Sequence, residues 1–194
     1  LPTTVWMEER GMGAQCWHHA APWHPDPGDS LFDLQVQFLE KTYDLPSLVA
    51  ECLESSREAV RLIETEGDEY GLLDMYRDRF ALLEEIASRP LPENPQERIE
   101  LVRTLYGDSG EGIGNILDVR AVSDRRDYPT TERLVHEETS RLVGGIRPTL
   151  AQARQAVDKI NEELHRGESV CFPFYDESDD EQPAGWYFVG NTID

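Results

Sequence analysis

Basic residues are scarce in this sequence. Its 194 residues contain 18 lysines and arginines against 39 aspartates and glutamates, so the net charge is −21 and the isoelectric point lies near 4.5. A nucleic-acid-binding protein needs clustered cations to contact phosphates, and electrostatic attachment to an anionic membrane needs a basic patch. We therefore predict no direct nucleic-acid binding and no membrane association.

Long apolar runs and paired cysteines are also missing. No stretch approaches the roughly 20 apolar residues that a membrane-spanning helix needs. The three cysteines, Cys16, Cys52 and Cys171, are far apart and form no C-x-x-C pair, which argues against a disulfide framework and a cysteine-rich zinc module. The first residues show no secretory signal pattern, so we expect a cytoplasmic protein.

Apolar spacing predicts helices through most of the chain. Residues that recur at intervals of three and four indicate helices over 30–43, 45–66, 72–87 and 95–106, a short one near 113–121, and another from 130 to 143. From Ile146 to Leu164 the apolar steps alternate between four and three. Such a heptad seam is typical of a helix that packs along an antiparallel neighbour.

The two ends of the chain differ from this helical centre. Residues 168–175 and 185–189 are aromatic and β-branched and predict a hairpin, in which Pro173 indicates an edge strand or a bulge. Residues 1–29 are interrupted by proline and glycine, yet contain three of the four tryptophans, and Thr3–Met7 is a candidate for a third strand.

These patterns together predict a mainly α fold in a single domain. It would consist of an extended aromatic N-terminal arm (1–29), a bundle of about five or six helices (30–167) and a short C-terminal β-hairpin (168–194) packed on the same domain.

One cluster of metal-ligand residues lies in the arm. Cys16, His18, His19 and His24 fall within nine residues, and thiolate and imidazole are ligands that zinc and other transition metals prefer. The spacing matches no standard zinc motif, and adjacent histidines point apart in an extended chain. The alternative is that these side chains only dock the arm on the protein.

Other catalytic patterns are incomplete. His136-Glu137 begins an H-E-x-x-H motif, but position 140 is Ser140 instead of histidine. Glu162-x-x-His165 lacks the second such pair that a di-iron bundle requires. The absence of a complete catalytic motif favours a non-enzymatic role.

We therefore predict an acidic protein-binding protein with a protein partner that has a basic surface: a subunit of a larger assembly, or an inhibitor or immunity-type protein that covers such a surface. One alternative is a metalloenzyme or metal-binding accessory subunit that uses Cys16, His18, His19 and His24. Another is a structural protein of a large particle. The predicted partner-binding residues are Trp6, Trp17, Trp23, Asp176, Glu177, Asp179, Asp180 and Glu181.

Overall fold

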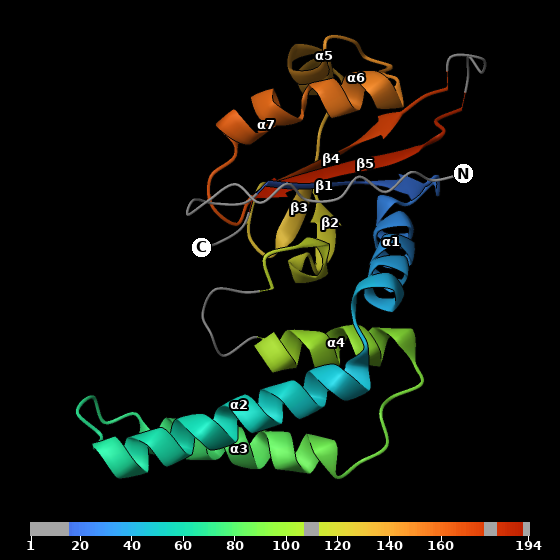
Figure 1. Ribbon diagram of the computed structural model, residues 1–194. Coiled ribbons are helices and arrows are strands. Elements are labelled where there is room, and N and C mark those ends of the chain that lie inside the picture. Colours follow the sequence, from blue (N-terminus) through green and yellow to red (C-terminus); the bar gives the residue numbers. More distant parts are fainter. Residues whose placement is uncertain (1–15, 107–112, 177–181, 192–194) are drawn as a thin grey trace. The chain divides into compact units, whose positions relative to one another are not determined.

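The computed structural model describes residues 16–106, 113–176 and 182–191 (Figure 1). The chain forms two compact units, the first from residues 1–38 and 107–194 and the second from residues 39–106. The described residues contain seven α-helices and a five-stranded mixed sheet. The fold is therefore mixed α/β, and the predicted mainly α bundle with only a short hairpin is wrong.

The sheet belongs to the first unit and has the strand order β1-β5-β4-β3-β2. β1 pairs antiparallel with β5 and β5 antiparallel with β4, whereas β4–β3 and β3–β2 are parallel pairs. The strands are β1 (Cys16–Pro22), β2 (Ala121–Ser123), β3 (Thr130–Arg133), β4 (Ser169–Phe174) and β5 (Gly185–Asn191).

Both faces of the sheet are buried. Along β5, Tyr187 and Val189 enter one apolar core, while Trp186 and Phe188 enter the other. Successive side chains of a strand point to opposite faces, so a strand covered on both faces is apolar at every position. This explains why β4 and β5 could be predicted from their continuous aromatic and aliphatic runs.

Three short helices cover one face of the sheet: α5 (His136–Val143), α6 (Leu150–Gln155) and α7 (Val157–Glu163) (Figure 1). Ala153, Val157 and Ile160, which belong to the predicted heptad seam, pack against Val170 and Tyr187 of the sheet. The predicted antiparallel helical neighbour is thus wrong, because this apolar stripe is buried against strands. The stretch also divides into two helices at Ala156.

The other face carries the start of α1 (Pro27–Thr42) and the short 3₁₀ helix η2 (Ile116–Asp118). Gln35 of α1 is buried, and its amide donates to the carbonyls of Ile116 and Val119 at 2.9 and 2.6 Å. A buried amide is stable only when its polar groups are hydrogen-bonded. These two bonds therefore hold the 113–119 segment on α1.

The second unit consists of the last turn of α1 together with α2 (Leu45–Glu66), α3 (Leu73–Ala87) and α4 (Pro95–Tyr106). These three helices are confirmed close to their predicted bounds. The side chain of Asn94 accepts the backbone N–H of Gln96 at 2.8 Å, the cap expected of asparagine before a first-turn proline. Leu83, Ile99, Val102 and Leu105 are fully buried or nearly so and form the centre of this unit.

Three strands lie where no strand was predicted. β1 occupies part of the segment expected to be an irregular arm, and β2 and β3 replace helix near residues 121 and 130. β4 is an inner strand, although Pro173 suggested an edge. Its pairing with β3 involves only Val170 and Cys171, so the missing N–H of Pro173 interrupts no bond there. Thr3–Met7 lies outside the described residues.

No helix in the described ranges combines the length and the apolar composition needed to cross a membrane.

Candidate functional site

The predicted metal cluster is divided between the two faces of the sheet. Cys16 and His18 face the α6–α7 side of β1, where the hydroxyl of Tyr187 lies 2.7 Å from Nδ1 of His18. Burial lowers the pKa of His18, and the charge of Arg154 lowers it further, whereas Asp158 acts in the opposite direction. Burial, with a smaller contribution from Asp158, raises the pKa of Cys16 to about 11. Both groups are therefore neutral at pH 7.

His19 and His24 have other surroundings. The His19 ring lies on the opposite face of β1, 6.1 Å from the Trp17 ring and 5.3 Å from that of Phe38 between centroids. His24 follows the strand, and its Nε2 is 2.8 Å from an oxygen of Asp33. Within the described ranges no three His, Cys, Asp or Glu side chains come close enough to hold a metal ion.

The metal site consequently stays a prediction, and elemental analysis tests it. If Cys16, His18, His19 and His24 do bind zinc or another transition metal, the purified protein should contain one equivalent. Replacing His18 and His24 by alanine should then remove it, while replacing the exposed His165 should not. A protein without stoichiometric metal, or metal retained in the His18→Ala/His24→Ala variant, would contradict this site.

The predicted aromatic contacts lie largely within the chain. Trp17 is only 6% exposed and covers Gly190 of the neighbouring strand. Trp23 is half-buried and stacks on Trp186, with ring centroids 5.3 Å apart and 11° between the planes. These indoles therefore stabilise the sheet of this chain, and a contact of Trp17 or Trp23 with a partner stays untested. Trp6 lies outside the described residues.

Of the predicted acidic tip, the structure describes Asp176, which is exposed just after β4. The remaining acidic residues of that prediction lie outside the described part: Glu177, Asp179, Asp180 and Glu181.

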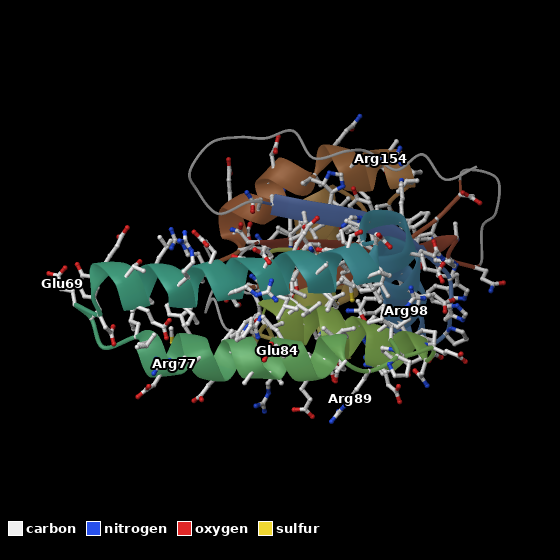
Figure 2. The ribbon with its side chains drawn as sticks, turned by 60° about the horizontal axis from the view of Figure 1, so that its bottom comes forward. Glu69, Arg77, Glu84, Arg89, Arg98 and Arg154 are labelled. Atoms are coloured by element: carbon white, nitrogen blue, oxygen red, sulfur yellow. The ribbon has the colours of Figure 1, made fainter. Side chains whose placement is uncertain are left out.

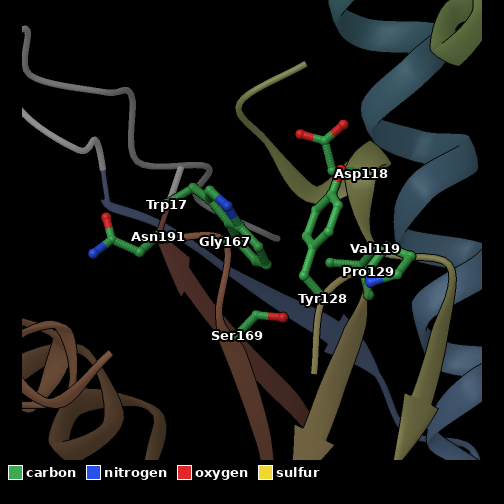
Figure 3. Close-up of a pocket in the computed structure, with 8 residues that line it drawn as sticks. All are labelled: Trp17, Asp118, Val119, Tyr128, Pro129, Gly167, Ser169 and Asn191. Carbon is green, nitrogen blue, oxygen red and sulfur yellow. The ribbon is translucent and has the colours of Figure 1, made fainter. Parts of the chain in front are cut away.

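A small hollow opens in the first unit (Figure 3). Its volume is about 10 Å³, near the lower limit for holding one water molecule. The Asp118 carboxylate beside it accepts the backbone N–H groups of Ile113 and Gly114, and Oδ1 of Asn191 is buried with no hydrogen-bond partner among the described residues. This hollow can hold a water and is too small for a substrate. Its lining comprises Trp17, Asp118, Val119, Tyr128, Pro129, Gly167, Ser169 and Asn191.

Three of the exposed apolar side chains lie near the far end of the α2–α3 hairpin in the second unit. Leu62 of α2 is 40% exposed, and Leu72 and Met75, at the start of α3, are 37% and 55% exposed. We name these three side chains the distal face. Tyr70, in the turn between the helices, is 79% exposed.

The turn that carries Tyr70 is ordered by local hydrogen bonds. The carboxylate of Asp68 accepts the backbone N–H groups of Leu72 and Leu73 at 2.6 and 3.2 Å, which satisfies the free donors that begin α3. Gly67 and Gly71 have φ angles of 107° and 68°, which other residues rarely adopt. The exposed tyrosine is thus held on a defined turn.

Carboxylates surround the distal face. Residues 45–88 contain eleven aspartates and glutamates against four arginines, a net charge of −7. Arg57, Arg61 and Arg77 form exposed ion pairs with glutamates of the same hairpin. Glu66, Glu69 and Asp78 have no ion pair with a described residue, and we name them the acidic rim. Figure 2 shows Glu69 at the far end of the hairpin.

Sequence reasoning missed this surface because it assigned one apolar stripe to each helix. Ile63, Leu73 and Tyr76 are half-buried between the helices, and each is adjacent in sequence to an exposed apolar residue of the distal face. When two adjacent residues of an amphipathic helix are both apolar, the apolar surface is wider than one neighbouring helix can cover. The apolar residues next to the buried ones were the signal for this surface in the sequence.

Comparison with protein families, with curated proteins and with solved structures found no match to this chain.

Proposed function

We propose that this chain is a non-enzymatic, acidic protein-binding protein that covers a basic surface of its partner, as a subunit of an assembly or as an inhibitor. The distal face and Tyr70 make the contact. The observation that carries this proposal is the exposure of Tyr70, Met75, Leu62 and Leu72 within a carboxylate-rich hairpin.

The composition of this surface supports protein binding. Interfaces between proteins are enriched in tyrosine and methionine at their centre and polar at their rim. An isolated exposed apolar residue needs no explanation, but several on one short hairpin indicate an interaction surface. The acidic rim would accelerate encounter with a basic partner and discourage acidic ones.

Two pairs of carboxylates provide a matched test of this role. After the co-purifying partner has been identified from the native source, the association rate is measured for the Glu66→Gln/Glu69→Gln variant at low and high salt. We expect a decrease of at least about threefold at low salt and a smaller difference at high salt, because steering by exposed charge is screened.

Glu137→Gln/Glu162→Gln is the control, since it changes the net charge equally at two exposed positions of the first unit. This variant should associate at close to the rate of the unmodified chain. Equal losses in the two variants would show that only net charge matters, and a salt-independent rate would rule out steering by the rim.

A further inference from the structure

We propose that the partner occupies the distal face with one amphipathic helix that has basic flanks. This inference rests on the proposed function and specifies the chemistry of the partner. The partner helix would lie on the α2–α3 hairpin beyond the C-terminal end of α4. Together, α4 and the partner helix would cover this side of the hairpin along its length.

α4 covers only the part of the hairpin farther from the turn. Figure 1 shows α4 beside the first part of α2, with its C-terminal end well short of the α2–α3 turn. There, the guanidinium of Arg79 donates to the carbonyls of Thr104 and Leu105 at 3.0 and 2.5 Å. The thiol of Cys52 on α2 is near enough to the last residue of α4 to contribute, after burial, to raising the pKa of Tyr106. Cys52 and Arg79 therefore mark where α4 stops.

The same side of the hairpin continues beyond α4, where none of the described helices covers it. Residues four and seven positions apart lie on one side of a helix. Met75 and Leu72 precede Arg79 by these intervals, and on α2 Ala59 follows Cys52 by seven, with Leu62 one further turn on. The distal face is thus the extension of the surface that binds α4. From Cys52 to Glu66 it measures about 20 Å, which accommodates a helix of about 14 residues.

The shape of this surface favours a helix as its occupant. Two packed helices present ridges and a groove, and a third helix fits them with its own ridges. α4 contacts the other end of the hairpin through α2 and through Arg79 of α3. A partner helix with an apolar stripe would cover Leu62, Leu72 and Met75 together.

The charge of the hairpin determines which residues would flank the apolar stripe of the partner helix. Glu66, Glu69 and Asp78 border the distal face and have no ion pair with a described residue, so lysines or arginines beside the stripe would meet carboxylates. A second copy of this chain would bring another hairpin of net charge −7 to the same place. Like charges at an interface are unfavourable, so we assign the face to a basic helix of a different protein.

A synthetic peptide tests the assignment with the full chain. The probe is an 18-residue peptide with leucines at helical spacing (i, i+3, i+4, i+7) and lysines or arginines at the other positions. Its comparison peptide has the same composition with the leucines scattered. We expect the first peptide to bind, as measured by fluorescence anisotropy, and the scattered peptide to bind at least about tenfold more weakly.

Protein variants locate the binding. Leu62→Ser/Met75→Ser should weaken binding of the helical peptide at least about tenfold, because it removes two apolar contacts at the centre. Val135→Ser/Ile146→Ser, at positions of similar exposure in the first unit, should change it less than about twofold. Circular dichroism establishes that the variants are folded. Equal binding of the two peptides, or undiminished binding to Leu62→Ser/Met75→Ser, would overturn the inference.

Two further outcomes separate this inference from the proposed function. If the helical peptide does not bind but Glu66→Gln/Glu69→Gln still slows association with the native partner, the helix assignment fails and the protein-binding role stands. If neither effect is seen, both fail. A dimer in sedimentation that is lost in Leu62→Ser/Met75→Ser would identify a second copy as the occupant and would also overturn the basic-helix assignment.

Discussion

Replacing Gly190 by alanine should lower the free energy of unfolding by about 3 kcal/mol, since overpacking a closed core usually costs about 1 to 3 kcal/mol and occasionally more. A Cβ at this position would lie 2.0 Å from Cζ2 of Trp17, whose ring is 6% exposed and directly across from Gly190 in the β1–β5 register. The indole is buried, so the added methyl group forces it or its strand to shift. The measurement is equilibrium unfolding in urea, followed by tryptophan fluorescence.

Tryptophan fluorescence suits this test because the three tryptophans that the structure describes, Trp17, Trp23 and Trp186, all belong to the first unit. Gly145→Ala is the control, since an added Cβ there meets nothing within 4 Å. It should change the free energy of unfolding by less than about 0.5 kcal/mol. In a Trp17→Leu background the further cost of Gly190→Ala should be smaller, because the two side chains interact directly. A loss of the same size in that background would contradict the packing explanation.

Acidification from pH 6.5 to pH 4 should destabilise the first unit through His19. Burial, with a smaller contribution from the neighbouring His18, lowers the pKa of His19 from 6.5 to about 4. In the unfolded chain the imidazole keeps its ordinary pKa, so between these two values the unfolded state binds the proton and the folded state does not. The stability that neutral His19 contributes is complete above pH 6.5 and is lost as the pH falls toward 4. A pKa difference of this size corresponds to about 3 kcal/mol.

The His19→Leu variant isolates this contribution. Its unfolding free energy, measured by urea titration at several pH values, should fall by about 3 kcal/mol less than that of the unmodified chain between pH 6.5 and 4. His165→Leu removes an exposed histidine and should leave the slope unchanged. If His19→Leu retains the full slope, His19 is charged in the folded protein or other groups cause the pH dependence.

The helices of the second unit could be predicted because their information is local. α2 and α3 repeat apolar residues over several turns, and Asp44 with Pro46 and Asn94 with Pro95 mark the starts of α2 and α4. The sheet could not be predicted in the same way. β1 pairs with β5, about 170 positions later in the chain, and β2 and β3 contain only three and four residues. Strands this short show too few alternations to be distinguished from loops or helix starts.

The candidate sites also differ in whether their information is local in the sequence. Cys16, His18, His19 and His24 are close in sequence, but alternation along β1 sends His18 and His19 to opposite faces of the sheet. That adjacent histidines point apart in an extended chain was predicted, and the structure confirms it. The distal face required the opposite kind of information. Leu62 and Met75 are separated by a turn, and among the described helices α4 ends short of that turn and leaves both exposed.

The sequence by itself determined the charge of −21, the three long helices of the second unit and the last two strands, since composition, helical period and apolar runs are local properties. Only the tertiary structure decided that the Ile146–Leu164 stripe lies on a sheet, that Trp17 covers Gly190, and that the distal face is open. Apolar periodicity specifies which side of an element is buried. What covers that side depends on pairings between distant residues, which periodicity does not encode.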